Sequence, residues 1–67
     1  MTVQEFFEAE KIFKSDVVAM QDESEYWEKA GNFVLENWDE EVNSLTQKQA
    51  NWLDRILEDL VEKRLKR

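Results

Sequence analysis

Residues 45–61 read LTQKQANWLDRILEDLV and contain the clearest structural signal in the chain. Thr46, followed three residues later by Gln49, has the capping-box spacing that starts a helix. Apolar residues then recur at the i, i+3, i+4, i+7, i+8 spacing of an amphipathic helix. They are Leu53, Ile56, Leu57, Leu60 and Val61. Cations follow them, where they complement the helix dipole, so the pattern predicts a helix over residues 47–65.

A first helix is predicted over residues 3–20. Thr2 and Glu5 have the capping-box spacing at its start. The apolar residues that share one face of this helix are Val3, Phe6, Phe13, Val17 and Met20. An alternative is a break near residues 14–16, because Ser15 can cap a new turn.

A second helix is predicted over residues 23–43. Its N-cap is either Asp22, paired with Glu25, or Ser24. Its apolar face consists of Trp27, Ala30, Gly31, Val34, Trp38 and Val42. This face is wide, which favours packing against two neighbouring elements. Gly31 on a buried face predicts that a neighbouring helix approaches closely there.

Composition limits both the fold and the chemistry. The chain has 67 residues, no cysteine, no histidine, no proline and one glycine, which predicts one all-α domain over residues 1–67, a compact three-helix bundle. Disulfides, thiolate and imidazole metal ligands, and histidine- or cysteine-based catalysis are therefore ruled out. We expect no catalytic residue, no metal and no cofactor, and hence a protein that is not an enzyme.

Charge is distributed unevenly along the chain. The formal net charge is −7, with −9 on residues 1–45 and +2 on residues 46–67. An acidic body repels nucleic acid and anionic membrane surfaces and attracts basic ones, which predicts a protein partner and no direct nucleic-acid or membrane binding. The N-terminal residues have no secretory signal pattern, so the expected location is the cytoplasm.

The predicted second helix has a row of carboxylates on its outer side, and aromatic residues flank the apolar stripes. The candidate partner-binding residues are Glu25, Glu28, Glu36, Asp39, Phe33 and Trp52. Such a row can imitate DNA phosphates and enter a basic cleft, and the plainer interpretation is an ordinary solubilising face. Aromatic residues are enriched at interfaces, so Phe33 and Trp52 are expected to contact the partner. The alternative is that they mediate self-association, in which case the chain is a structural or assembly protein that forms a homodimer.

Residues 45–57 also resemble a segment of small phage and prophage proteins, with the pattern Leu-Ser/Thr-x-Lys-Gln-x-x-Trp before an amphipathic helix. The resemblance covers roughly the last third of the chain and transfers no functional residue. It implies a phage-encoded accessory protein in the host cytoplasm. Such proteins often bind and inhibit a nucleic-acid enzyme or a defence complex of the host.

Overall fold

The computed structural model of the chain describes residues 1–65 and the side chains through Lys63. Its elements are α1 (Val3–Glu8), α2 (Lys14–Met20), α3 (Glu25–Glu36), the 3-10 turn η1 (Val42–Ser44) and α4 (Gln47–Leu65). The all-α class is confirmed, and residues 1–65 contain no strand. The predicted number of helices is wrong, because four α-helices are present where three were expected.

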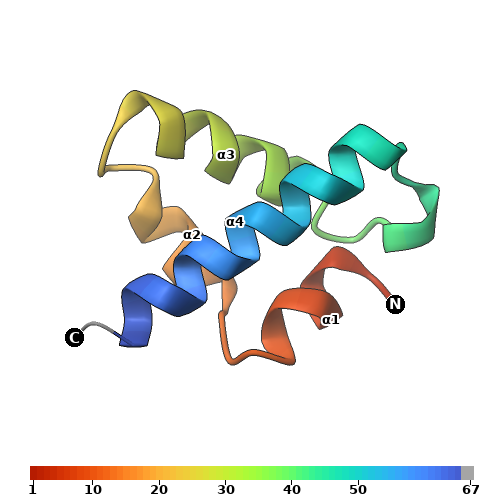
Figure 1. Cartoon of the computed structure of the whole chain (residues 1–67), viewed down its shortest axis with the longest axis horizontal. Helices are drawn as coiled ribbons and strands as arrows, with labels where there is room; N and C mark the ends of the chain where they lie inside the picture. Colours follow the sequence, from red (N-terminus) through yellow and green to blue (C-terminus); the bar gives the residue numbers. More distant parts are fainter. Residues whose placement is uncertain (66–67) are drawn as a thin grey trace.

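The helices surround one small core. Figure 1 shows α3 along the upper side, α1 at the lower right, α2 on the left behind α4, and α4 running diagonally across the view. The buried hydrophobic residues are Val3, Phe7, Ile12, Val17, Met20, Ala30, Val34, Trp38, Leu53 and Ile56. Trp38 belongs to this core although it lies outside any helix, and its ring centroid is 6.1 Å from that of Phe7. Every helix therefore contributes to the same core.

The predicted helix over residues 3–20 is interrupted at residues 9–13. The Ile12 N–H donates to the Phe7 carbonyl (3.1 Å) and the Lys11 N–H donates to the Glu8 carbonyl (2.9 Å). This is the Schellman pattern of a helix C-terminus, in which the residue at the Lys11 position is left-handed. Lys11 has φ 60°, a conformation usually occupied by glycine. The turn allows both Phe7 and Ile12 to enter the core.

Helix α2 begins earlier than the alternative prediction placed it. Phe13 is the N-cap where Ser15 was expected, and its N–H donates to Oδ2 of Asp16, three residues later, at 2.8 Å. The turn before it changes the direction of the chain, and the face predicted for a continuous helix is not preserved. Phe13 is 49% exposed, whereas Val17 and Met20 remain buried.

Helix α3 starts as one of the two alternatives predicted, with Ser24 Oγ accepting the Trp27 N–H at 3.2 Å. The predicted close approach at Gly31 is also confirmed. A β-carbon at Gly31 would overlap Cγ of Gln21, which follows α2. The Gln21 side chain crosses this point to donate to Asn32 Oδ1 at 2.7 Å. The absence of a side chain at Gly31 thus allows the C-terminal end of α2 to pack on α3.

The prediction that this helix continues to residue 43 is wrong. The chain turns away instead, and its carbonyl oxygens face the start of α1. The Trp38 carbonyl accepts the Gln4 N–H (3.0 Å), and the Glu40 carbonyl accepts the Val3 N–H (2.9 Å). The first N–H groups of a helix have no partner within that helix, so this loop satisfies donors that α1 leaves unpaired.

Helix α4 has the predicted bounds and the predicted start. Thr46 Oγ1 accepts the Gln49 N–H at 3.2 Å, and Gln49 Oε1 accepts the Thr46 N–H at 3.0 Å. This reciprocal capping box satisfies two groups that the first turn would leave unpaired. Leu53 and Ile56 are buried, so the predicted stripe faces the core.

Candidate functional site

The outer side of α3 carries three of the four predicted partner-binding carboxylates. Glu25, Glu28 and Glu36 are all exposed, and Glu25 and Glu36 are separated by three helical turns. Lys29 lies among them, with its Nζ 3.8 Å from Glu25 Oε1. The acidic face of α3 therefore contains three carboxylates and one cation. The exposed ion pair between Lys29 and Glu25 adds little stability.

The fourth predicted carboxylate, Asp39, does not lie on a helix. It is exposed in the loop after α3, next to the exposed residues Glu40 and Glu41. An antiparallel bridge between Thr2 and Glu41 fixes this loop beside the start of α1. Glu5 is exposed in the first turn of α1. The loop thus places further exposed carboxylates after the C-terminal end of α3, where Glu41 pairs with the N-terminal ammonium group at 3.2 Å.

The two predicted aromatic residues lie against each other. The rings of Phe33 on α3 and Trp52 on α4 are stacked, with centroids 4.6 Å apart and planes at 16°. Both are half-buried against the core. Trp52 Nε1–H donates to the hydroxyl oxygen of Tyr26 at 3.2 Å, and Tyr26 is 47% exposed. We call Tyr26, Phe33 and Trp52 the aromatic cluster.

Tyr26 was not among the predicted partner-binding residues. It lies seven residues before Phe33, a spacing that places both on the same flank of α3. This spacing was available from the sequence, but the hydrogen bond to Trp52 depends on how α3 and α4 pack.

Opposite charges border the aromatic cluster. On α4, the exposed residues Lys48 and Arg55 stand one turn before and one turn after Trp52. On α3, the exposed Glu36 stands one turn after Phe33. The surface around the cluster therefore carries both Glu36 and the cation Lys29, one turn from Phe33, on the α3 side, and is basic on the α4 side.

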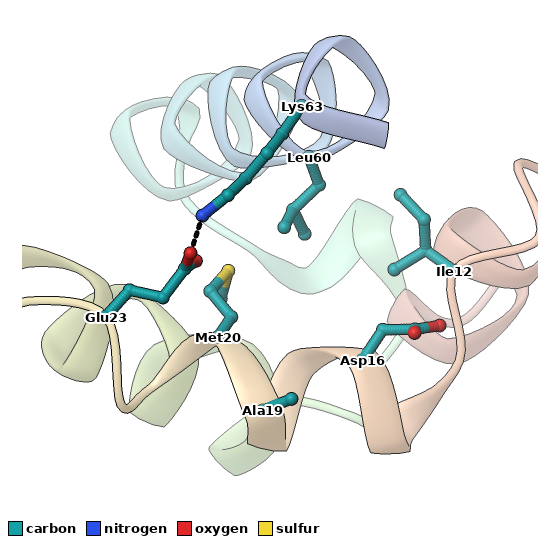
Figure 2. Close-up of a pocket in the computed structure, with 7 residues that line it drawn as sticks. All are labelled: Ile12, Asp16, Ala19, Met20, Glu23, Leu60 and Lys63. Carbon is teal, nitrogen blue, oxygen red and sulfur yellow. Dashed lines mark hydrogen bonds and ion pairs between the residues drawn. The ribbon is translucent and has the colours of Figure 1, made fainter. Parts of the chain in front are cut away.

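A groove lies between α2 and the C-terminal half of α4, with a volume of about 360 Å³. Figure 2 shows its lining residues, which are Ile12, Asp16, Ala19, Met20, Glu23, Leu60 and Lys63. Lys63 reaches from α4 and donates to Glu23, which closes one end of the groove. None of these residues was predicted to bind anything, because the groove depends on the break between α1 and α2. We call it the α2–α4 groove.

The side chains through Lys63 include no group of three or more His, Cys, Asp or Glu residues arranged to hold a metal ion.

The pKa of Glu5 is lowered, first because its carboxylate accepts the Thr2 backbone N–H (2.8 Å) and second through the Thr2 side chain. This carboxylate caps α1, so its shifted pKa has a structural cause. The described surface of α3 and α4 therefore offers a binding partner exposed charges and the apolar rings of the aromatic cluster.

Within residues 1–65, no helix combines the length and the apolar character that crossing a membrane requires. No protein family, curated protein or solved structure compared with the chain matches it. The resemblance of residues 45–57 to phage proteins stays a prediction.

Proposed function

We propose that the chain is a non-enzymatic protein-binding module that docks the acidic face of α3 onto a basic surface of another protein. The observation that carries this proposal is the position of the aromatic cluster beside that face. Glu36 lies one turn from Phe33, and Glu25 precedes Tyr26 directly. Carboxylates speed the approach to a basic surface, and partly exposed aromatic residues anchor the complex once it forms.

The partner that fits this surface best is a nucleic-acid-binding protein. Its basic cleft has evolved to attract anions, and a carboxylate face competes for it by charge. The spacing of the carboxylates limits how far the imitation extends. Glu25, Glu28 and Glu36 span about 16 Å of helix, whereas duplex DNA carries one phosphate per ~1.7 Å. The competition therefore depends on charge attraction rather than on a copy of duplex geometry.

In biological terms, the proposal is a phage-type accessory protein that inhibits an enzyme or defence complex in the host cytoplasm. This part rests on the resemblance of residues 45–57 and on the acidic charge of residues 1–45. It predicts that DNA competes with the chain for its partner.

The proposal is tested by capturing partners from the lysate of the host with the immobilised chain and measuring their association rates at several salt concentrations. Glu28→Lys/Glu36→Lys reverses charge on the face, and Asp54→Lys/Glu58→Lys makes the same charge change on exposed positions of α4. We expect the first variant to slow association about tenfold or more at low salt and the second to slow it much less. Equal slowing by both variants, or association that does not depend on salt, would reject the docking of α3.

A second candidate function is self-association through the aromatic cluster. The observation that favours it is that the carboxylate Glu36 borders the cluster on α3 while the cations Lys48 and Arg55 border it on α4. Under a twofold axis, Glu36 of one copy would face Lys48 or Arg55 of the other, because an isologous interface uses the same patch twice. Sedimentation at low and high concentration separates the two functions. A tight dimer that Tyr26→Ala dissociates would favour this alternative.

A further inference from the structure

The α2–α4 groove has a floor that suits an aliphatic group. Ile12 and Met20 are buried beneath it, and Leu60 points into the space between the two helices (Figure 2). A volume of about 360 Å³ lies at the lower end of the range in which proteins bind small groups, about 300–1,000 Å³. The groove therefore has room for a few side chains of a bound segment, but not for a folded surface.

The charges around the groove select for a cation. Its lining contains two carboxylates, Asp16 and Glu23, and one ammonium group, that of Lys63. Lys63 is already engaged with Glu23. Asp16 accepts the Phe13 N–H with Oδ2, and its side chain is exposed. The lining has a net negative charge, so an anion entering it would be repelled and a cation would meet Asp16.

The chain itself shows how such a ligand fits. Lys63 combines an aliphatic stem with an ammonium group, and this group binds Glu23 while lying 5.9 Å from the centroid of the Trp27 ring. An ammonium over an aromatic face gains a further attraction. One end of the groove is thus occupied by a basic amphipathic side chain from the chain's own α4, and the other end, at Asp16, also has a carboxylate beside aliphatic residues.

We propose that the α2–α4 groove binds a short basic segment of a partner protein, in which a lysine or arginine stands next to leucine-like residues. The cation pairs with Asp16, and the aliphatic neighbour covers Met20 and Leu60. This inference rests on the proposed function for the existence of a partner protein. The groove's preference is nevertheless a property of this chain and is measured without that partner.

The test uses two synthetic peptides, acetyl-Leu-Arg-Leu-amide and acetyl-Leu-Glu-Leu-amide, titrated into the intact protein while methyl NMR signals are followed. We expect the arginine peptide to shift the methyl signals of Ile12, Met20 and Leu60 saturably. The glutamate peptide should bind about tenfold or more weakly, because it places an anion against two carboxylates.

Two variants make the result specific to the groove. Asp16→Asn keeps an oxygen that can accept the Phe13 N–H, and it should weaken the arginine peptide about fivefold, the loss of one charged hydrogen bond. Asp22→Asn removes the same charge from an exposed position that does not line the groove, and it should change affinity by less than about twofold. Thermal unfolding of both variants checks that they remain folded.

Several outcomes would overturn the inference. They are equal binding of the two peptides, equal weakening by Asp16→Asn and Asp22→Asn, shifts confined to the aromatic cluster, and no saturable shift at the solubility limit. Apart from shifts confined to the aromatic cluster, none of these outcomes involves α3. Failure here therefore leaves the salt-dependent docking of α3 as a separate question with its own measurement.

Discussion

Helix α4 and the segment that contains α1 and α2 are stabilised in different ways. Helix α4 has 19 residues and is capped by its own Thr46 and Gln49. Helices α1 and α2 have six and seven residues, which is shorter than the ~12–15 residues that an isolated helix needs in water. Helix α1 also has its own capping box, Thr2 with Glu5, but its Val3 and Gln4 N–H groups depend on carbonyl oxygens from a distant loop. Helix α4 is therefore specified locally, whereas α1 and α2 require the rest of the fold.

The greatest loss of stability is expected for Phe7→Ala, which removes a fully buried ring from the shortest helix. Its free energy of unfolding should fall by about 3–5 kcal/mol, as measured by urea unfolding followed by circular dichroism. Phe6→Ala is the control, because Phe6 is only half-buried at the next position. If both variants lost the same stability, the burial of Phe7 would not be what fixes α1.

Thr46→Ala tests the local capping of α4. It should cost about 1 kcal/mol and reduce hydrogen-exchange protection in the first turn of α4, because the Gln49 N–H loses its acceptor. Thr46→Ser, which keeps the hydroxyl, should restore most of the stability. A loss of protection spread over α1 and α2 as well would contradict the local specification of α4.

Gly31→Ala tests the contact of α2 with α3. Alanine raises helix propensity by up to about 1 kcal/mol, but its β-carbon would overlap Gln21 Cγ. We therefore expect the substitution to be neutral or destabilising in the wild-type protein and stabilising in a Gln21→Ala background. Thermal unfolding of the four proteins of this cycle measures the coupling. A coupling energy of zero would mean that Gln21 yields without cost.

Lys11→Gly should stabilise the protein by about 0.5–1 kcal/mol, because glycine adopts the left-handed conformation at this turn more readily than lysine does. Lys29→Gly removes the same charge from the middle of α3 and should destabilise the protein by a similar amount. Urea unfolding of the two variants should therefore shift in opposite directions. Shifts in the same direction would indicate an effect of charge instead of backbone conformation.

The smallest effect is expected from the charge of Glu5, and it depends on pH. Because the folded-state pKa of Glu5 lies below its ordinary value of 4.5, its contribution to stability is present above that value and is lost as the pH falls through the lower folded pKa. The stability difference between the wild type and Glu5→Gln should therefore shrink in acid. Urea midpoints measured from about pH 7 to about pH 3 follow it. A difference that stays constant over this range would contradict the assignment.

The contrast between these regions also explains what the sequence predicts. Thr46 and Gln49 mark the start of α4 because a capping box consists of side chains, which the sequence displays. The turn at Lys11 has no such mark, since neither glycine nor proline occurs there and the conformation is imposed by burying Phe7 and Ile12 together. The end of α3 at Glu36 is not predicted for a related reason. The loop after it is held by the backbone carbonyls of Trp38 and Glu40, which accept N–H groups of α1, and backbone carbonyls leave no mark in a sequence because every residue has one.

For the candidate site, the sequence supplied the residues but not their arrangement. Phe33 and Trp52 were each predicted as flank residues of their own helices, and Glu25, Glu28 and Glu36 are exposed on α3 as expected. The stacking of the two rings depends on how α3 and α4 cross, which helical periodicity does not specify. The α2–α4 groove depends in addition on the turn that separates α1 from α2.

The positions of the three tryptophans give the chain a built-in set of fluorescent reporters. Trp38 is buried near Phe7, Trp52 stacks on Phe33, and Trp27 lies under the ammonium group of Lys63. Each indole thus reports on a different contact: the loop with α1, α3 with α4, and the end of α4 with the start of α3. Variants that retain a single tryptophan would show optically which contact opens first and which one a bound partner covers.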